Sequence, residues 1–340
     1  MERLHYLETG STDPAYNLAF EEYVLTHRMD GDYLILWQND NTVVVGQNQN
    51  TAAEVNRAFV EAHGVHVVRR TTGGGAVYHD LGNLNYTLIT GQSGALDYDR
   101  CLAPVLRALN ALGVPAQKSR TCDMTVDGKK ISGSAQKIAN GRVLHHGTLL
   151  FDADLTRLDE ITTGRKNNAF CSKGTQSAIC AVTNLRPYLR EDCEIVTFAR
   201  QLAQKILPPG AKTVRLTQAQ LADVRRLAAE LYQSWDWTWG KTPAFTYEKT
   251  AEFAGRPIRV RYEARHGLIR NAAVQSESGV LCAWLKNEGE EIRKGEALYE
   301  IETDKVVNQI EATEDGILRR QLCEEGDSVA VLTPVAIIET

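Results

Sequence analysis

The chain has 340 residues, of which 43% are hydrophobic and 24% charged, and its net charge is −5 at pH 7. These values are typical of a globular protein with room for two or three domains, and the negative charge without basic blocks argues against a nucleic-acid partner. No apolar run reaches the roughly 18–20 residues that span a bilayer, and the N-terminus lacks a signal or transit pattern, so we expect a cytoplasmic protein with no membrane association.

The first part of the chain alternates helix and strand signals. An Asp-Pro pair opens a helix predicted over residues 15–27, and apolar runs predict strands over residues 33–37 and 42–45. A second helix is predicted over residues 52–63, followed by a strand over residues 65–68. These elements lead directly into a glycine-rich segment.

The glycine-rich segment covers residues 69–80 and reads RRTTGGGAVYHD. Three glycines, two hydroxyls and two guanidiniums at a strand end suit an anion that is held by backbone N–H groups. A plain tight turn, the competing interpretation, would need one or two glycines and no paired arginines.

The next elements favour an α+β fold over a regular parallel array. A strand is predicted over residues 84–89, and a helix over residues 100–112 that ends at Gly113. Asp127-Gly128 is a hairpin signal that places Lys130 at the start of the returning strand. Small residues follow Lys130 and leave room for a ligand, so Lys130 is a candidate binding residue, whereas we interpret its neighbour Lys129 as a surface side chain.

A second hairpin signal precedes the adjacent residues His145 and His146. Neighbouring side chains on a strand face opposite sides, so this pair cannot form a simple metal site, and the metal ligands stay unknown. A helix is predicted over residues 216–232, and three tryptophans at alternate positions after it are interpreted as capping a core rather than forming a binding cage. They are Trp235, Trp237 and Trp239.

The seven cysteines stand singly along the chain, without a CxxC pair. A scattered odd set indicates reduced thiols and argues against a disulfide framework or a zinc site. Each cysteine is more typical of a small buried side chain than of a nucleophile.

The C-terminal part contains an internal repeat. Residues 271–279 align without gaps on residues 308–316, and the same offset of 37 continues to residues 301–303 and 338–340. Each half alternates apolar and polar residues between glycine turns, which predicts two related sheets packed as a flattened barrel or sandwich. Residues 304–307 join the two halves and place Lys305 at an exposed turn.

Three motifs, RRTTGGGAVYHD, KKISGSAQ (residues 129–136) and HHGTLL (residues 145–150), occur in an order and spacing that resemble the lipoate–protein ligase A family. The resemblance covers residues 1 to about 276. It implies a catalytic domain related to biotin ligases and class II synthetases, and a reaction in which ATP and Mg²⁺ activate lipoate as an adenylate before transfer to a lysine. Because the substrate carboxylate is itself the nucleophile, the reaction needs fixed cations rather than a protein nucleophile.

The resemblance also assigns site residues. Lys130 is implied as the catalytic residue that contacts both adenylate and lipoate. The further positions implied in binding ATP or the adenylate are Arg70, Gly75, Ala76, Val77, Tyr78, Asn83 and Asp123. The further positions implied in binding lipoate are Gly73, Gly74 and His146. His79 and His146 are candidates for a general base in the transfer step.

The repeat separately resembles a lipoyl domain, with ETDK at residues 302–305 similar to its lysine hairpin. Biotin carriers place Met on both sides of their lysine, whereas Asp304 and Val306 flank Lys305, so lipoylation of Lys305 is expected. The acceptors implied are lipoyl domains of the 2-oxoacid dehydrogenase E2 or glycine cleavage H protein type. We therefore predict a ligase domain over residues 1–244, a shortened accessory segment over 245–270 and a lipoyl domain over 271–340.

Three departures from the family pattern stand out. Cys122 replaces an asparagine, and Ile179 and Ala181 replace two arginines. The helices of the accessory domain are missing, so the strand over residues 272–275 is predicted both as the last accessory strand and as the first lipoyl strand. Such a short junction leaves open whether Lys305 is modified in cis or by a neighbouring molecule.

Two other functions stay open at the level of sequence. A transferase could carry octanoyl or lipoyl groups through a thioester on Cys171 or Cys180, although neither lies in a motif for an activated thiol. Alternatively, the chain could be a lipoyl carrier whose ligase part is a non-catalytic scaffold. The choice between lipoate and octanoate and the oligomeric state are also open.

Overall fold

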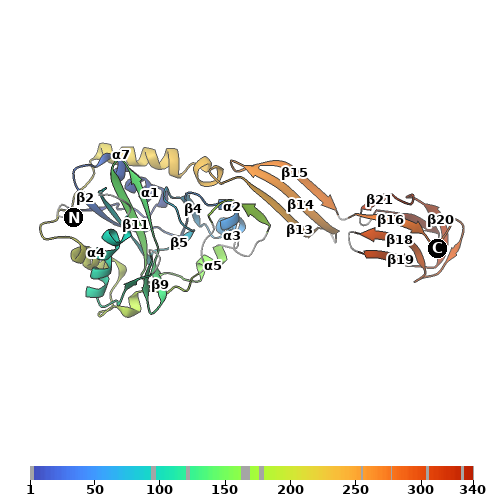
Figure 1. The fold of residues 1–340 in the computed structure, drawn as a ribbon, viewed down its shortest axis with the longest axis horizontal. Coiled ribbons are helices and arrows are strands. Elements are labelled where there is room, and N and C mark those ends of the chain that lie inside the picture. The colour runs from blue at the N-terminus through green and yellow to red at the C-terminus, as the bar shows by residue number, and fades with distance from the viewer. Residues whose placement is uncertain are drawn as a thin grey trace. The chain divides into compact units, whose positions relative to one another are not determined.

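A computed structural model describes residues 4–92, 97–119, 123–161, 169–175, 180–253, 256–276, 278–303, 306–330 and 333–339. The chain divides into two units, Met1–Phe245 with Ala264–Leu268, and Thr246–Glu263 with Ile269–Thr340. Figure 1 labels the main elements of both. Within the described ranges, no helix is long and apolar enough to cross a membrane.

A mixed five-stranded sheet forms the centre of the first unit. In spatial order its strands are β1 (Leu4–Glu8), β2 (Asp32–Trp37), β6 (Asn83–Gly91), β11 (Arg142–Leu150) and β10 (Ser134–Ala139). β1 and β2 are parallel, and all other neighbours are antiparallel. The expected α+β class is thus confirmed.

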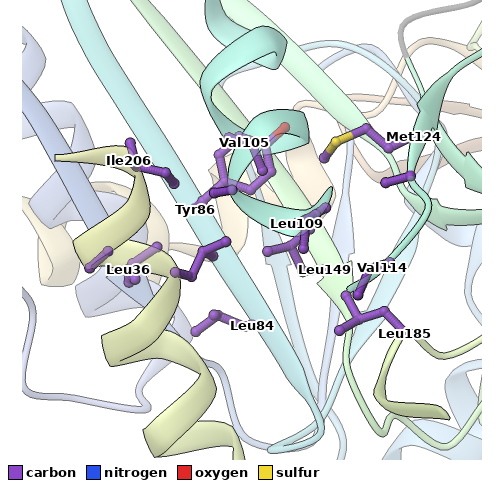
Figure 2. Packing of buried hydrophobic residues seen from close by; sticks show 14 of the residues in the cluster. Leu36, Leu84, Tyr86, Val105, Leu109, Val114, Met124, Leu149, Leu185 and Ile206 are labelled. Carbon is purple, nitrogen blue, oxygen red and sulfur yellow. The ribbon is translucent and has the colours of Figure 1, made fainter. Parts of the chain in front are cut away.

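Helices cover both faces of this sheet because β2 is apolar on both sides. Leu34 and Leu36 join one core cluster, and Tyr33 and Ile35 join another, as alternation along a strand requires. The first cluster includes residues of α4 (Tyr98–Ala111) and α6 (Ile195–Ile206), and the second includes residues of α1 (Pro14–His27) and α7 (Gln218–Leu227). Figure 2 shows side chains of the first cluster, among them Val105 and Leu109 of α4 and Ile206 of α6.

Two small sheets complete the part of the unit that carries the motifs. One has the order β4 (His66–Arg69), β3 (Thr42–Val45) and β5 (Val77–His79). The other has the order β7 (Gln117–Lys118), β8 (Met124–Val126) and β9 (Lys129–Ser132). The glycine-rich segment connects β4 to β5, and Lys130 lies on β9, as the sequence predicts.

The helix predicted over residues 52–63 is two short helices, α2 (Thr51–Glu54) and α3 (Arg57–Ala62). The break occurs because Asn56 caps the second helix, with its side chain accepting from Phe59 N–H. Asn56 N–H also donates to the Ile161 carbonyl at 2.7 Å instead of continuing the first helix.

Both predicted hairpins are confirmed by left-handed backbone conformations. Asp127 and Gly128 have φ values of 48° and 75°, and Asn140 and Gly141 have values of 51° and 69°. Positive φ at both central residues is typical of the two-residue turn that matches strand twist.

The helix predicted over residues 216–232 is α7 followed by a π-helical turn, η3 (Ala228–Tyr232). A second such turn, η4 (Asp236–Gly240), contains Trp237 and Trp239, and Trp235 directly precedes it. Trp237 and Trp239 pack against core clusters, as expected. Trp235 differs, because it is 48% exposed. The remaining elements of this unit are α5 (Arg157–Ile161), β12 (Phe170–Ser172) and the 3₁₀ turn η2 (Arg186–Tyr188).

The second unit begins with three neighbouring strands, β13 (Phe245–Phe253), β14 (Arg256–Arg265) and β15 (Leu268–Ser276). The strand predicted over residues 272–275 therefore lies in β15, beside β14. Its second predicted role, as the first strand of the lipoyl fold, is not seen in this pairing.

The repeat folds into two sheets around a small core. One sheet has the order β19 (Val306–Glu311), β18 (Ala297–Thr303), β16 (Ser278–Trp284) and β21 (Ser328–Ala330). The other has the order β17 (Glu291–Ile292), β20 (Gly316–Gln321) and β22 (Ala336–Glu339). The core between them consists of Ile292, Leu298, Ala312 and Leu318. Lys305 lies outside the described residues, between the paired residues Thr303 and Val306.

Candidate functional site

Arg70, the last residue before the glycine loop, shapes that loop with its guanidinium. Its Nη2 donates to the carbonyls of Gly73 at 2.6 Å and Gly75 at 2.8 Å. Its Nη1 donates to the Val44 carbonyl at 3.1 Å, and its Nε donates to Thr72 Oγ1 at 3.0 Å. The loop is thus built around the arginine side chain.

Gly74 is required at the centre of this loop for two reasons. Its φ of +93° is rarely adopted by residues with a Cβ atom, and a Cβ there would lie 2.9 Å from Arg70 Nη2. A larger residue would therefore displace the guanidinium.

Among the residues that the structure describes, no carboxylate pairs with the buried charge of Arg70. Arg70 is only 7% exposed, and its guanidinium donates to three neutral carbonyls and a hydroxyl. Burial lowers the pKa of Arg70 to about 10 from its ordinary 12.5. A buried cation without an anion is costly, so this site favours an anionic ligand.

Arg69 has a different role from the one that the paired arginines suggested. It is fully buried and points away from the cavity that Arg70 lines. Its guanidinium donates to the carbonyls of Gly46 at 3.0 Å, Gln49 at 2.9 Å and Thr238 at 2.9 Å. Adjacent residues on a strand end face opposite ways, so only one of the two arginines can reach a ligand.

Lys130 provides a second cation at the same cavity. Its Nζ lies 3.0 Å from Asp123 Oδ1, and both side chains are little more than a quarter exposed. The backbone of Lys130 is fixed on both sides, with its N–H donating to the Ala181 carbonyl and its carbonyl accepting from Thr183 N–H. A Cβ at Gly133 would lie 3.0 Å from Lys130 Nζ, so the glycine keeps the ammonium accessible.

His146 lies in a hydrogen-bond chain that ends at Arg70. Its Nδ1 lies 3.2 Å from both carboxylate oxygens of Glu21, and its Nε2 lies 2.8 Å from Thr72 Oγ1. The carboxylate can only accept, so we assign the ring hydrogen to Nδ1, and Nε2 then accepts from the Thr72 hydroxyl. Both ring nitrogens are therefore occupied, and His146 orients Thr72 rather than presenting a free base.

His79 is a buried neutral histidine. Its Nδ1 accepts from Asn39 Nδ2 at 3.2 Å, so its hydrogen is on Nε2, for which the described residues offer no partner. Burial above all, with the charge of Arg70 as a further cause, lowers the pKa of His79 to about 3. His79 is thus a hydrogen-bond donor near neutral pH, and not a general base.

These groups surround one cavity of about 200 Å³ in the first unit. Apolar side chains form one part of its wall: Leu18, Trp37, Val44 and Val77. The two cations, Asp123 and the two histidines form another part of its wall. A cavity with an apolar wall and fixed cations can bind an acid that has an aliphatic body.

The structure brings most of the predicted residues to this cavity. Those that line it are Arg70, Gly74, Gly75, Val77, Asp123, Lys130 and His146. Gly73 contributes its carbonyl to Arg70, but Ala76, Tyr78 and Asn83 are not among the lining residues. Val77 and His79 face the cavity while Tyr78, between them on β5, faces away and donates to Asn41 Oδ1 at 3.0 Å.

Sequence reasoning missed the apolar wall. Trp37 ends β2 and Val44 lies within β3, two strands whose apolar pattern is typical of a core, and Leu18 is a buried residue of α1. A side chain that lines a small buried cavity has the same sequence pattern as one packed in a core, so no local signal could separate them.

The two cysteines considered for a thioester, Cys171 and Cys180, are exposed and do not line the cavity. Cys122 and Ile179 lie outside the described residues. Ala181, at the second replaced arginine position, contributes its backbone carbonyl to Lys130.

The chain is similar to known proteins over both of its parts. Residues 13–207 match the family described as lipoyl protein ligase A/B catalytic domain, and residues 271–338 match the one described as biotin-requiring enzyme. A lipoate–protein ligase of Bacillus subtilis (strain 168) is 35% identical, covering 77% of this chain and 81% of that protein.

Solved structures show the same likeness. A lipoate complex of LipL1 from P. falciparum superposes with a TM-score of 0.61 at 25% identity, covering 80% of this chain and 84% of that one. A lipoate–protein ligase A bound with ATP superposes with a TM-score of 0.57 at 26% identity, covering 71% of this chain and all of that one.

Proposed function

The chain belongs to the lipoyl protein ligase A/B family, and we propose that it uses ATP to convert lipoate to lipoyl-AMP before passing the lipoyl group to a lysine. Lipoate–protein ligase activity and a fused lipoyl domain are its established features. The observation that carries the mechanism is the buried charge of Arg70, which has only neutral partners and shares one cavity with Lys130.

In the first step, a carboxylate oxygen of lipoate attacks the α-phosphorus of ATP and pyrophosphate leaves. Two anions must approach each other, and charge builds on the phosphoryl oxygens. Arg70 and Lys130 supply fixed positive charge on the cavity wall. Because no carboxylate among the described residues pairs with Arg70, a ligand anion would not have to displace one. The apolar wall at Trp37, Val44 and Leu18 would hold the aliphatic body of lipoate.

Mg²⁺ fits this site as a companion of ATP. Within the described ranges, no cluster of three or more metal-binding side chains exists, and Asp123 is the carboxylate that lines the cavity. Mg²⁺ commonly uses one or two carboxylates together with substrate phosphates. Asp123 and the phosphates would hold it there, and the ion would neutralise phosphate charge.

In the second step, a lysine amine attacks the carbonyl of the mixed anhydride, and AMP leaves as the amide forms. We propose Lys305 as one acceptor, in cis or in trans, and lipoyl domains of the E2 or H protein type as others. Removing the proton from a lysine with pKa about 10.4 costs about 4–5 kcal/mol at pH 7. His146 has both ring nitrogens occupied and His79 is a donor, so neither is available to recover that cost as a base.

An intact-mass assay tests the activation step. Purified chain given lipoate, ATP and Mg²⁺ should gain one lipoyl group and release pyrophosphate. Lys130→Ala should lose both signals, whereas the matched variant Lys129→Ala should keep them, because Lys129 is exposed and outside the cavity. Labelling of the native chain without ATP would refute the adenylate route.

A mixing experiment tests where Lys305 receives its lipoyl group. A Lys130→Ala chain offers an acceptor without activity, and a Lys305→Ala chain offers activity without an acceptor. Lipoylation of the first by the second shows the trans route. Its absence, with wild-type labelling independent of protein concentration, shows the cis route.

A further inference from the structure

One hydrogen-bond donor in the cavity of the first unit lacks an acceptor among the described residues. This donor is Nε2 of His79, a residue that is 3% exposed and lines the cavity. By contrast, both ring nitrogens of His146, the other histidine of the cavity, have protein partners. A buried donor without an acceptor costs free energy, so a donor left unpaired at a cavity wall indicates a ligand that supplies the acceptor.

A series of amides that begins on α1 fixes the position of the hydrogen on His79. Asn17 Nδ2 donates to the carbonyl oxygens of Ser11 at 3.1 Å and Gln38 at 2.8 Å, and because carbonyls only accept, the orientation of this amide is determined. The same Nδ2 donates to Asn39 Oδ1 at 3.0 Å, so Asn39 Nδ2 is left to donate to His79 Nδ1 at 3.2 Å. The imidazole hydrogen therefore lies on Nε2.

A second amide reaches the same ring nitrogen from β6. Asn83 Nδ2 donates to Asn85 Oδ1 at 3.1 Å, so Asn85 directs its own Nδ2 toward His79 Nδ1, at 3.5 Å. Burial lowers the pKa of His79 to about 3, so the ring is neutral at neutral pH. Two amides thus hold Nδ1 as an acceptor and keep the hydrogen on the other ring nitrogen.

His79 lies beside the apolar part of the cavity wall. It follows Val77 by two residues on β5, so both side chains are on the same face of the strand, and both line the cavity. The ring of Trp37 lies edge-on to the His79 ring, with 6.2 Å between their centroids. An acid whose carboxylate faces Lys130 would place its aliphatic body along Trp37 and Val77, where the Nε2–H of His79 would meet it.

We propose that His79 is a specificity-determining residue that selects lipoate over octanoate. The inference rests on the proposed function and deepens it, because it assigns the acid that the cavity prefers. The two sulfur atoms of the dithiolane ring carry lone pairs and accept hydrogen bonds weakly, whereas a methylene group accepts none. A site built around a hydrogen bond rejects the analogue that lacks its partner, because the buried group of the protein is then left unpaired.

Three acids separate the hydrogen bond from the shape of the substrate. They are lipoate, octanoate and 5-cyclopentylpentanoate, which has the ring size and chain length of lipoate with carbon in place of both sulfurs. The full-length chain is given each acid with ATP and Mg²⁺, and kcat/KM is measured from pyrophosphate release and intact mass. In the wild-type chain, kcat/KM for lipoate should exceed that for the cyclopentyl acid at least about tenfold.

Variants assign this preference to the donor. His79→Leu should bring the ratio of kcat/KM for lipoate to that for the cyclopentyl acid to within about threefold of one. His79→Gln, which restores an N–H donor, should give a ratio above that of His79→Leu. Val77→Ala is the matched control, because it changes the shape of the same wall without removing a donor. It should lower kcat/KM for both acids and keep their ratio within about twofold of the wild-type value.

A wild-type ratio near one overturns the proposal, and so does a His79→Leu chain that keeps the wild-type ratio. These outcomes leave the proposed function intact, because the chain is still lipoylated in an ATP-dependent reaction. A wild-type chain that none of the three acids labels contradicts the proposed function instead. In that case the following measurement on the wild-type chain decides the inference about His79.

Nitrogen NMR of the full-length chain labelled with ¹⁵N-histidine reads the donor without any turnover. The signals of His79 are assigned as those missing from His79→Gln. They should show a neutral ring with the hydrogen on Nε2, and lipoate should shift the Nε2 signal more than the cyclopentyl acid does. A hydrogen on Nδ1, or equal shifts with the two acids, overturns the proposal.

Discussion

The same substitution should have different effects at the two adjacent arginines at the end of β4. Methionine at position 70 should mainly lower activity, whereas methionine at position 69 should mainly lower stability. Burial lowers the pKa of both Arg69 and Arg70 to about 10. Replacing either with methionine therefore removes a cost of about 3 kcal/mol in free energy for burying a charged guanidinium. Each replacement also removes hydrogen bonds worth about 1 kcal/mol apiece. The balance between these two effects differs between the arginines.

For Arg70→Met, the lost partners are the Val44, Gly73 and Gly75 carbonyls and Thr72 Oγ1. The removed cost of burying the charge offsets most of the free energy lost with these hydrogen bonds. We therefore expect the free energy of unfolding to fall by only about 1 kcal/mol. The cation that faces the ligand is gone, however. We expect kcat/KM for lipoylation to fall about 10²–10³-fold, which corresponds to about 3–4 kcal/mol of transition-state stabilisation.

For Arg69→Met, the guanidinium has more partners to lose, namely carbonyls of Gly46, Gln47, Gln49, Trp237 and Thr238 and hydroxyls of Thr51 and Thr242. We expect a loss of about 4 kcal/mol in the free energy of unfolding. Whatever folded protein remains should keep kcat/KM within about tenfold, because Arg69 does not reach the cavity.

Urea unfolding followed by tryptophan fluorescence and a lipoylation assay with an added lipoyl domain give the two quantities for each variant. The reasoning fails if Arg70→Met unfolds the protein while Arg69→Met leaves its stability intact. It also fails if Arg70→Met retains more than a tenth of the wild-type kcat/KM.

Three further predictions concern the cavity wall and the buried histidines. Glu21→Gln should raise KM for lipoate or lower kcat about tenfold, because His146 loses the carboxylate that orients it toward Thr72. Unchanged kinetics would refute a functional role for the series of hydrogen bonds from Glu21 through His146 and Thr72 to Arg70. Gly133→Ala should lower kcat/KM about tenfold, since its Cβ would lie 3.0 Å from Lys130 Nζ, while Ser134→Ala, which adds no atom, should have a smaller effect in the same assay. Burial lowers the pKa of His79 and of His145 to about 3, so the unfolded chain binds more protons than the folded one between pH 3 and about 6.5 and stability rises with pH in that window. Unfolding free energies should therefore fall by about 2 kcal/mol for each of these histidines from pH 7 to pH 5, and His145→Asn, measured by urea unfolding at both values, should remove about half of that pH dependence.

The sequence predicts the elements of the ligase unit well where local chemistry decides them. Asp127-Gly128 and Asn140-Gly141 adopt left-handed turns because few other residue pairs do so at low cost. The helix over residues 52–63 fails because Asn56 donates its N–H to Ile161, a residue more than a hundred positions away. Such a contact depends on tertiary packing and leaves no local pattern.

The cavity shows the same division. Glycines, paired cations and a hairpin lysine mark its polar side in the sequence, and the structure brings Arg70, Asp123 and Lys130 together there. Which arginine faces the cavity depends on the strand alternation at the end of β4, and this requires the boundary of β4 to within one residue. That accuracy lies beyond pattern reading.

The repeat shows most sharply what a pattern can and cannot decide. An offset of 37 predicts the pairing of β20 with β22 from that of β16 with β18, down to the position of the bulge. It predicts the partner of residues 269–274 equally well, yet the structure gives that segment to β14. In the structure residues 269–274 lie in β15 beside β14, so the symmetry of the repeat alone does not decide which sheet this segment joins.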